Sequence, residues 1–291
     1  MKKALFTSKN LIGDGLWISL ALKAWWEKNK NEYDTVDILT LDDHVKTIYY
    51  GMGVPLRGMF YGNNGLRYDF MHTFDVSKAF KLSDEKGQHV AESYADLLGV
   101  DIGRKADKSH LVPIYQPAWP DEVVKDWVPF DLLDKRPILI SMFSASCASR
   151  KGERANKMLP WPKWLPILQK IRQTFPDNPI RFLGAPTDIE TPYPFGATGM
   201  VQSGEWLLGI PLDRLAHIMR ECLFVVTLDN GMAHMAASQG SREFIFYPRV
   251  LSTYYILPWG NKRMEFIHMD PSTLNPVQAV WALQNAWKKW G

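Results

Sequence analysis

The chain has 291 residues, a length that suits two domains of ordinary size. Hydrophobic residues make up 46% of the chain and charged residues 22%, a balance that excludes a disordered or fibrous protein. The net charge of +3 is too small to indicate a protein whose main affinity is for the nucleic-acid backbone, although it is compatible with a local basic groove.

The first part of the chain predicts a parallel βαβ unit. Residues 3–7 predict a short buried strand, which is followed by a glycine-containing loop and an amphipathic helix that starts near Leu16. Residues 36–40 predict the second strand. Strand, glycine turn, helix and strand in this order are typical of a parallel sheet. A further helix is expected over residues 85–99.

The second part of the chain repeats this alternation after a break. Residues 110–137 are rich in Pro and Trp and predict an irregular linker. Strands are then expected at 137–141, 180–184, 224–227 and 243–247, alternating with helices at 162–175, 212–221, 231–239 and 275–290. Two successive βα halves indicate an α/β protein with two Rossmann-like domains facing a cleft. The loops that follow strands are the places to look for chemistry, because ligands of open α/β sheets bind at the carboxyl ends of the strands.

The first candidate motif is Gly13-Asp14-Gly15, between the first strand and the first helix. Glycines allow a tight turn and a close backbone approach to a ligand. Asp14 would stand at the helix start, where it can face a ligand or act as an N-cap that accepts from free backbone N–H groups. The spacing does not match the GxGxxG pattern of dinucleotide-binding folds.

The second candidate motif runs from Leu228 to Ala237 and contains Asp229, Asn230, Gly231 and His234. A buried strand here leads through a turn into a helix of small residues. The free N–H groups and the positive dipole end of such a helix can bind a diphosphate. Asp229 can orient a sugar hydroxyl or cap the turn. A single His on the first helical turn is either a ligand contact or a hydrogen-bonded structural residue.

The third candidate motif is the loop after the strand at 137–141. Ser144 and other hydroxyls are followed by four cations between residues 150 and 157, of which Lys157 is the last. Arg and Lys both pair with phosphates, so the loop can hold the phosphate of a donor or of an acceptor. The alternative is a solvated surface loop, the usual meaning of a run of charges.

Together these segments resemble family 9 of the glycosyltransferases, the heptosyltransferases of lipopolysaccharide core assembly. The segments that carry the resemblance are Ile12-Gly13-Asp14, 89–99, 183–188, 208–216, 225–234 and Pro258-Trp259-Gly260, in the family's order. Two places differ from the family. The chain has Phe246-Tyr247-Pro248-Arg249 where the family usually has Phe-Gly-Pro-Thr, and Lys157 stands four residues ahead of Trp161 rather than two.

The resemblance implies a GT-B fold, with residues 1–130 as the acceptor domain and 131–275 as the nucleotide-sugar domain. The last helix, 276–291, is expected to pack back on the first domain; its Trp and Lys residues also allow it to lie on a membrane surface. The implied reaction is inverting, metal-independent transfer of a sugar from a nucleoside diphosphate to an acceptor hydroxyl. Asp14 is the expected general base, flanked on the acceptor side by Gly13 and Gly15. The expected donor-binding residues are Ser144, Lys157, Asp229, Asn230, Gly231, His234 and Arg249.

Two alternatives remain at this point. Small glycosyltransferases of this fold also modify hydroxymethylated bases of viral DNA, and the chain's 13% aromatic residues and basic loops would allow stacking and phosphate contacts. The other alternative is a nucleotide-sugar-binding module without catalysis. The partners expected are therefore a nucleotide sugar and a glycan or lipopolysaccharide-core acceptor, or else DNA.

The sequence predicts neither a metal nor a cofactor. It has no Asp-x-Asp pair after a strand, and its two cysteines, Cys147 and Cys222, belong to no Cys/His cluster. No apolar run approaches the ~20 residues that cross a bilayer. We therefore expect a cytoplasmic protein that is at most peripheral at the inner membrane surface.

Overall fold

The structure is a computed structural model. It describes residues 2–8, 12–40, 47–49, 54, 56–60, 67–103, 134–142, 159, 161–184, 206–248, 258, 263–269 and 274–290. The chain divides into two compact units, one formed by residues 1–118 with 252–261 and the other by 119–251 with 262–291. The predicted boundary near residue 130 falls among residues that are not described, so its position stays a prediction.

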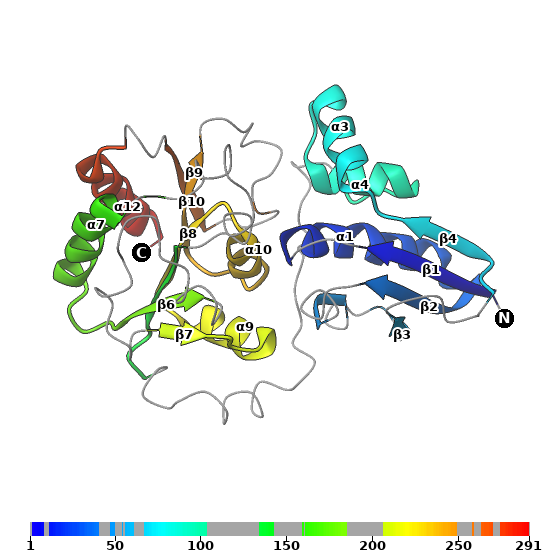
Figure 1. The fold of residues 1–291 in the computed structure, drawn as a ribbon, viewed down its shortest axis with the longest axis horizontal. Coiled ribbons are helices and arrows are strands. Elements are labelled where there is room, and N and C mark those ends of the chain that lie inside the picture. The colour runs from blue at the N-terminus through cyan, green and yellow to red at the C-terminus, as the bar shows by residue number, and fades with distance from the viewer. Residues whose placement is uncertain are drawn as a thin grey trace. The chain divides into compact units, whose positions relative to one another are not determined.

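The first domain is built on a four-stranded parallel sheet with the order β3-β2-β1-β4 (Figure 1). Its elements are β1 (Lys2–Ser8), α1 (Ile12–Asn29), β2 (Tyr33–Thr40), β3 (Leu56–Phe60), β4 (Phe70–Thr73), α3 (Val76–Lys86) and α4 (Val90–Leu98). The predicted βαβ unit is thus confirmed. Strands β3 and β4 and helix α3 were not predicted.

An aromatic core fixes α1 against this sheet. The ring of Phe6, at the centre of β1, lies 4.9 Å from the ring of Trp25 in α1 and 5.8 Å from the ring of Phe74, which follows β4. On its other side α1 packs against α4. Side chains all round the helix are therefore buried, including the run from Leu16 to Leu22. This packing holds the N-terminus of α1 at the carboxyl end of β1.

The single helix expected over residues 85–99 is wrong, because the chain forms two helices there. Helix α3 ends at Gly87, whose φ of 64° is a left-handed conformation that favours glycine. Helix α4 then begins with His89 as its N-cap. The Nδ1 atom of His89 accepts from the backbone N–H of Ala91 at 3.0 Å, and Glu92 accepts from the N–H of His89 at 2.7 Å. This capping box assigns His89 a structural role.

The second domain is built on a six-stranded parallel sheet with the order β10-β9-β8-β5-β6-β7 (Figure 1). Its elements are β5 (Ile138–Ser141), α7 (Trp161–Thr174), β6 (Ile180–Gly184), β7 (Trp206–Leu208), α9 (Leu212–Glu221), β8 (Phe224–Leu228), α10 (Gly231–Ser238), β9 (Glu243–Pro248), β10 (Met264–Met269) and α12 (Pro276–Trp290). The four strands and four helices predicted here are present within one or two residues. The edge strands β7 and β10 were not predicted.

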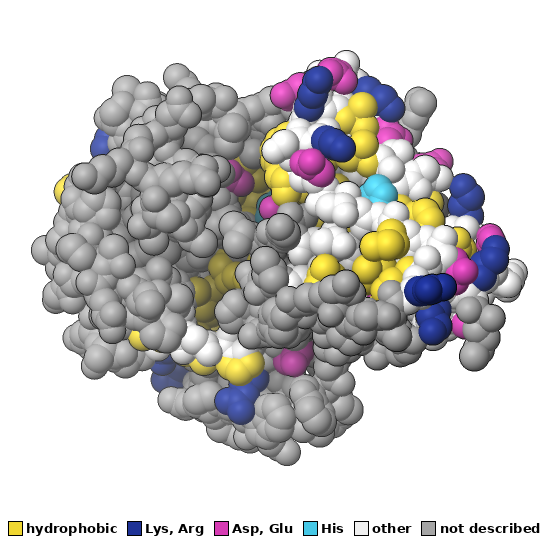
Figure 2. Space-filling view, turned by 45° about the vertical axis from the view of Figure 1, so that its right-hand side comes forward, with side chains coloured by type: hydrophobic (Ala, Val, Ile, Leu, Met, Phe, Trp, Pro, Cys, Tyr) yellow, Lys and Arg dark blue, Asp and Glu magenta, His cyan; other side chains and the backbone are white. Residues whose placement is uncertain are grey.

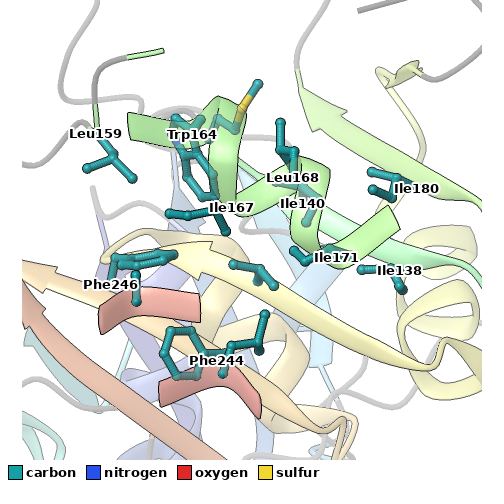
Figure 3. Close-up of a cluster of buried hydrophobic side chains, with 14 of the residues drawn as sticks. Ile138, Ile140, Leu159, Trp164, Ile167, Leu168, Ile171, Ile180, Phe244 and Phe246 are labelled. Atoms are coloured by element: carbon teal, nitrogen blue, oxygen red, sulfur yellow. The ribbon is translucent and has the colours of Figure 1, made fainter. Parts of the chain in front are cut away.

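One face of this sheet carries the main hydrophobic core of the domain, under α7 and α12. Trp164 of α7 points toward Phe246 of β9, with their rings 5.3 Å apart and nearly perpendicular (Figure 3). The side chains of Ile138, Ile140 and Phe244 come from the strands into the same cluster. The opposite face of β8 and β9 contacts α10.

The C-terminal helix α12 contributes to this core of the second domain, and its expected packing on the first domain stays a prediction. Its buried stripe of Ala279, Leu283 and Ala286 faces the second sheet beside α7 (Figure 1). The ring of Trp287 lies 4.9 Å from that of Phe175, just after α7. The guanidinium of Arg242 lies 5.4 Å from the Trp287 ring, a distance at which a cation–π contact is stabilising. The apolar face is thus satisfied within its own domain.

Candidate functional site

Polar side chains gather at the carboxyl end of β1 in the first domain. Ser8, the buried last residue of β1, accepts a hydrogen bond from the hydroxyl of Tyr49 at 2.9 Å. The hydroxyl of Tyr94, from α4, donates to Oδ1 of Asp14 at 3.5 Å. Burial, and in second place the negative charge of Asp14, raises the pKa of the Tyr94 hydroxyl. Asp14 is therefore placed at the strand end, as predicted, and Tyr94 is a partner that the sequence did not indicate.

Asp14 does not have the N-cap position that the alternative interpretation gave it. Helix α1 begins at Ile12, so Asp14 lies inside its first turn, between Gly13 and Gly15. Both glycines were expected in a loop, but the structure has them in the helix. A carboxylate in the first turn is stabilised by the positive end of the helix dipole, typically by about 0.3–1 kcal/mol. The structure thus offers a partly buried anionic group at the end of the first strand.

In the second domain, Asn230 lies with Asp229 in the two-residue turn between the end of β8 and the start of α10. It is the N-cap of α10, and its Oδ1 atom accepts from the backbone N–H groups of Met232 at 2.9 Å and Ala233 at 3.2 Å. Its Nδ2 atom donates to Oγ of Ser141, the buried last residue of β5, at 3.0 Å. One side chain therefore fixes both the helix start and its position beside the neighbouring strand. Asn230 therefore has the N-cap role at the start of α10, which the sequence did not assign to it.

A buried polar group lies on the face of the sheet that α10 contacts. The carboxylate of Glu243 is fully buried and accepts from the hydroxyl of Thr227 at 3.4 Å. In the β8–β9 register Thr227 is paired with Ile245. Two positions further along, Tyr247 in β9 therefore lies near Asp229, which follows β8. Both residues stand at the carboxyl ends of their strands. Burial, together with the negative charges of Asp229 and Glu243, raises the pKa of the Tyr247 hydroxyl well above its ordinary value.

Asp229 and His234 are both predicted site residues that the structure finds buried. Each exposes only 6% of its surface. Asp229 lies in the turn after β8, and His234 lies in the first half of α10. Both can orient the turn. Gly231, at the start of the helix, is only partly buried. Thr227, Glu243 and Tyr247 were not singled out from the sequence. Their signal was one polar residue in the apolar strand 224–228 and two polar residues at even spacing in 243–247, which places these two on one face.

Three predicted donor residues, Ser144, Lys157 and Arg249, lie outside the described residues, as does the basic loop 150–157. Their roles stay predictions. Among the residues that the structure describes, no group of three His, Cys, Asp or Glu side chains could hold a metal ion. None of the described helices is long and apolar enough to cross a membrane.

Asn230 provides a stability test of this arrangement. Replacing it with Ala removes the cap and the bond to Ser141, so we expect the free energy of unfolding to fall by about 1–2 kcal/mol. Asn230→Asp keeps the cap oxygen but cannot donate to Ser141, so it should lose less stability than the Ala variant. Urea denaturation of the two variants and the wild type measures both effects. Equal stability of Asn230→Ala and the wild type would contradict the capping role.

The fold was compared with known proteins. No family model matches the sequence, and a search of curated proteins finds no match. Among solved structures, the chain is similar to the ADP-heptose lipopolysaccharide heptosyltransferase II of E. coli, with 15% identity over 99% of both chains and a TM-score of 0.71. A family 9 glycosyl transferase of Veillonella parvula has 14% identity over 99% of this chain and 98% of its own, with a TM-score of 0.71.

A third similar structure is the E. coli heptosyltransferase WaaC solved with ADP, with 13% identity over 98% of this chain and 99% of its own, and a TM-score of 0.67. These likenesses extend over nearly the whole chain, and they agree with the two parallel sheets and their order of elements. The chain therefore has the GT-B fold of two Rossmann-like domains, the fold of the heptosyltransferases that its sequence resembles.

Proposed function

We propose that this protein is a heptosyltransferase-like glycosyltransferase, which moves a sugar from a nucleoside diphosphate to an acceptor hydroxyl with inversion and without a metal. The main support for the proposal is that a carboxylate and a helix N-terminus each stand at a strand end of a GT-B fold. A carboxylate, Asp14, stands at the end of the first strand of one domain, and a helix N-terminus at Gly231 follows a central strand of the other. The structural neighbour WaaC was solved with ADP, which supports a nucleotide-bearing donor.

The donor site in this proposal is the start of α10. The Asn230 side chain already accepts from the N–H groups of Met232 and Ala233. A diphosphate oxygen would therefore approach the N–H of Gly231, where the absence of a side chain leaves the backbone accessible. The positive end of the helix dipole would stabilise the charge that develops on the departing diphosphate. Ser144, Lys157 and Arg249 are proposed to contribute further donors and cations.

The proton acceptor in this proposal is Asp14. As the acceptor oxygen bonds to the anomeric carbon, the bond from that carbon to the diphosphate oxygen breaks, and the hydroxyl proton passes to a carboxylate oxygen of Asp14. Displacement from the face opposite the leaving group inverts the anomeric centre. Tyr94, which donates to Oδ1 at 3.5 Å, would hold the carboxylate in place while the other oxygen accepts the proton.

The proposal is tested by nucleotide binding followed by donor turnover. ADP, GDP, UDP and CDP are each titrated in a thermal-denaturation assay, and at least one should raise the melting temperature with the logarithm of its concentration. A ligand at a hundred times its dissociation constant stabilises by about 2.7 kcal/mol. Sugar conjugates of the best nucleotide are then incubated without acceptor, and release of the nucleoside diphosphate is measured. Slow release is expected. Binding without release would indicate an inactive binding module, and no shift with any nucleotide would contradict the proposal.

Metal independence is a separate prediction. Helix dipole and cations are proposed to neutralise the leaving diphosphate, so donor hydrolysis should continue at an unchanged rate in EDTA. The rate is measured before and after treatment, and again after Mg²⁺ or Mn²⁺ is added. Activity that disappears in EDTA and returns with either ion would show that a metal supplies this stabilisation instead.

A further inference from the structure

Helix α12 has a second apolar side besides the one buried in the core. Its core stripe is Ala279, Leu283 and Ala286. Another set of residues recurs at the three- and four-residue spacing of one helix face, namely Val277, Val280, Trp281, Gln284, Trp287 and Lys288. Of these, Val280 and Trp287 also pack against the edge of the core. Within this set Val277 is 74% exposed and Trp281 is 65% exposed. Two large apolar side chains thus project into solvent from a helix that already has a satisfied core face.

This second side forms one wall of a groove, and α7 forms the other. The groove has a volume of about 250 Å3. Its apolar lining includes Ile167 and Ile171 from α7 and Val280 and Trp287 from α12. Lys170 and Lys288 also line it, one from each helix. The exposed Val277 and Trp281 do not line the groove, but they stand three residues before the lining residues Val280 and Gln284 on the same helix. Apolar side chains together with two cations suit an amphiphilic partner.

The charge of the two helices is one-sided. Together α7 and α12 contain five cations and no Asp or Glu, and the cations are Lys163, Lys170, Arg172, Lys288 and Lys289. Lys289 is paired with Glu265 of β10 at 2.7 Å, and Lys163 donates to the carbonyl of Leu274. On the first domain, by contrast, Lys and Arg alternate with Asp and Glu over the face seen in Figure 2. The α7–α12 groove therefore complements a negatively charged partner.

We propose that the α7–α12 groove docks the protein on an anionic lipid membrane. Trp281 and Val277 enter the boundary between headgroups and acyl chains, and Lys170 and Lys288 pair with lipid phosphates. Trp suits this boundary because its ring is apolar and its N–H stays within reach of water. A second copy of the chain fits the groove poorly, since a twofold contact would bring two surfaces of the same positive charge together. The proposal is independent of sugar transfer.

The experiment is co-sedimentation of the whole chain with vesicles. Vesicles of equal parts phosphatidylcholine and phosphatidylglycerol should pellet the protein, vesicles of phosphatidylcholine alone should not, and high salt should release it. Trp281→Ser should weaken partitioning by about tenfold, since most of a Trp side chain leaves the interface. Lys170→Glu and Lys288→Glu should each weaken it by about fivefold or more.

Matched controls come from the first domain. Met71→Ser removes a side chain that is 66% exposed on β4, and Lys81→Glu reverses a charge on a side chain that is 78% exposed on α3. Both should bind vesicles like the wild type. The proposal is overturned if the controls and the groove variants bind equally, or if the wild type does not pellet with anionic vesicles. It is also overturned if the wild type is a dimer in analytical ultracentrifugation and Trp281→Ser is a monomer, because a second copy then covers the groove.

Discussion

Replacing Asp14 with Asn is expected to lower the turnover number by about 10²–10⁴-fold, the usual contribution of a general base. Asn retains an oxygen that can accept from the Tyr94 hydroxyl, so the local geometry should survive. Loss of the carboxylate from the first turn of α1 removes only the dipole interaction, which is about 0.3–1 kcal/mol. The melting temperature and the affinity for the donor nucleotide should therefore stay near wild type. Single-turnover kinetics with the responding donor and a calorimetric melt measure the three quantities.

Asp84→Asn is the matched control, because it makes the same chemical change at an exposed position of α3 in the same domain. It should leave turnover unchanged. Should Asp14→Asn turn over within a few fold of wild type, the carboxylate is not the base, and the proton must pass to another group. Should it instead unfold, Asp14 is mainly a structural residue of the helix start.

Replacing Gly231 with Val is expected to abolish nucleotide binding without unfolding the chain. The backbone of Gly231 is helical, so Val can adopt it, and the cost of its β-branched side chain in a helix is below about 1 kcal/mol. The added side chain would occupy the space through which a diphosphate oxygen approaches the N–H. Isothermal titration with the nucleotide found in the thermal screen measures the loss.

Met232→Val serves as the control for helix propensity, since it places the same side chain one residue further into α10. It should keep nucleotide affinity within a few fold of wild type. Unchanged affinity in Gly231→Val would remove the start of α10 from the donor site. A fall of similar size in both variants would mean that the whole helix start, rather than the open backbone at Gly231, is being disturbed.

The central strands of the second domain could be predicted because they are buried on both faces. Ile138–Ser141 and Phe224–Leu228 therefore read as continuous apolar runs between turns. Edge strands lack this signal. Phe70–Thr73 alternates between half-buried and exposed positions, and Met264–Met269 contains Glu and His, so both were missed. Helix α3 was missed because it buries only Ala79 and Ser83, which leaves almost no apolar stripe to recognise.

The candidate site was predicted in its positions but not in its contacts. Asp14 and the turn at Asn230–Gly231 were recognisable from strand, turn and helix patterns within about ten residues. Their partners are distant in sequence. The Tyr94 hydroxyl reaches Asp14 across 80 residues, and Asn230 reaches Ser141 across 89 residues. The first pair depends on the packing of α1 against α4, and the second on β5 and β8 being neighbours in the sheet. Periodicity along the chain reveals neither.

The strand order of the second sheet has a consequence for where a ligand can bind. From β5 the chain moves outward to β6 and β7, and it then returns to the other side of β5 with β8, β9 and β10. The neighbours β5 and β8 are thus a topological switch point, from which connections leave toward α7 on one face and α10 on the other. Because these two connections leave on opposite faces of the sheet, neither covers the carboxyl ends of β5 and β8. The Ser141–Asn230 bond marks this point. The opening at these strand ends is therefore a property of chain topology, which persists while side chains change, as the fold itself does at 15% identity.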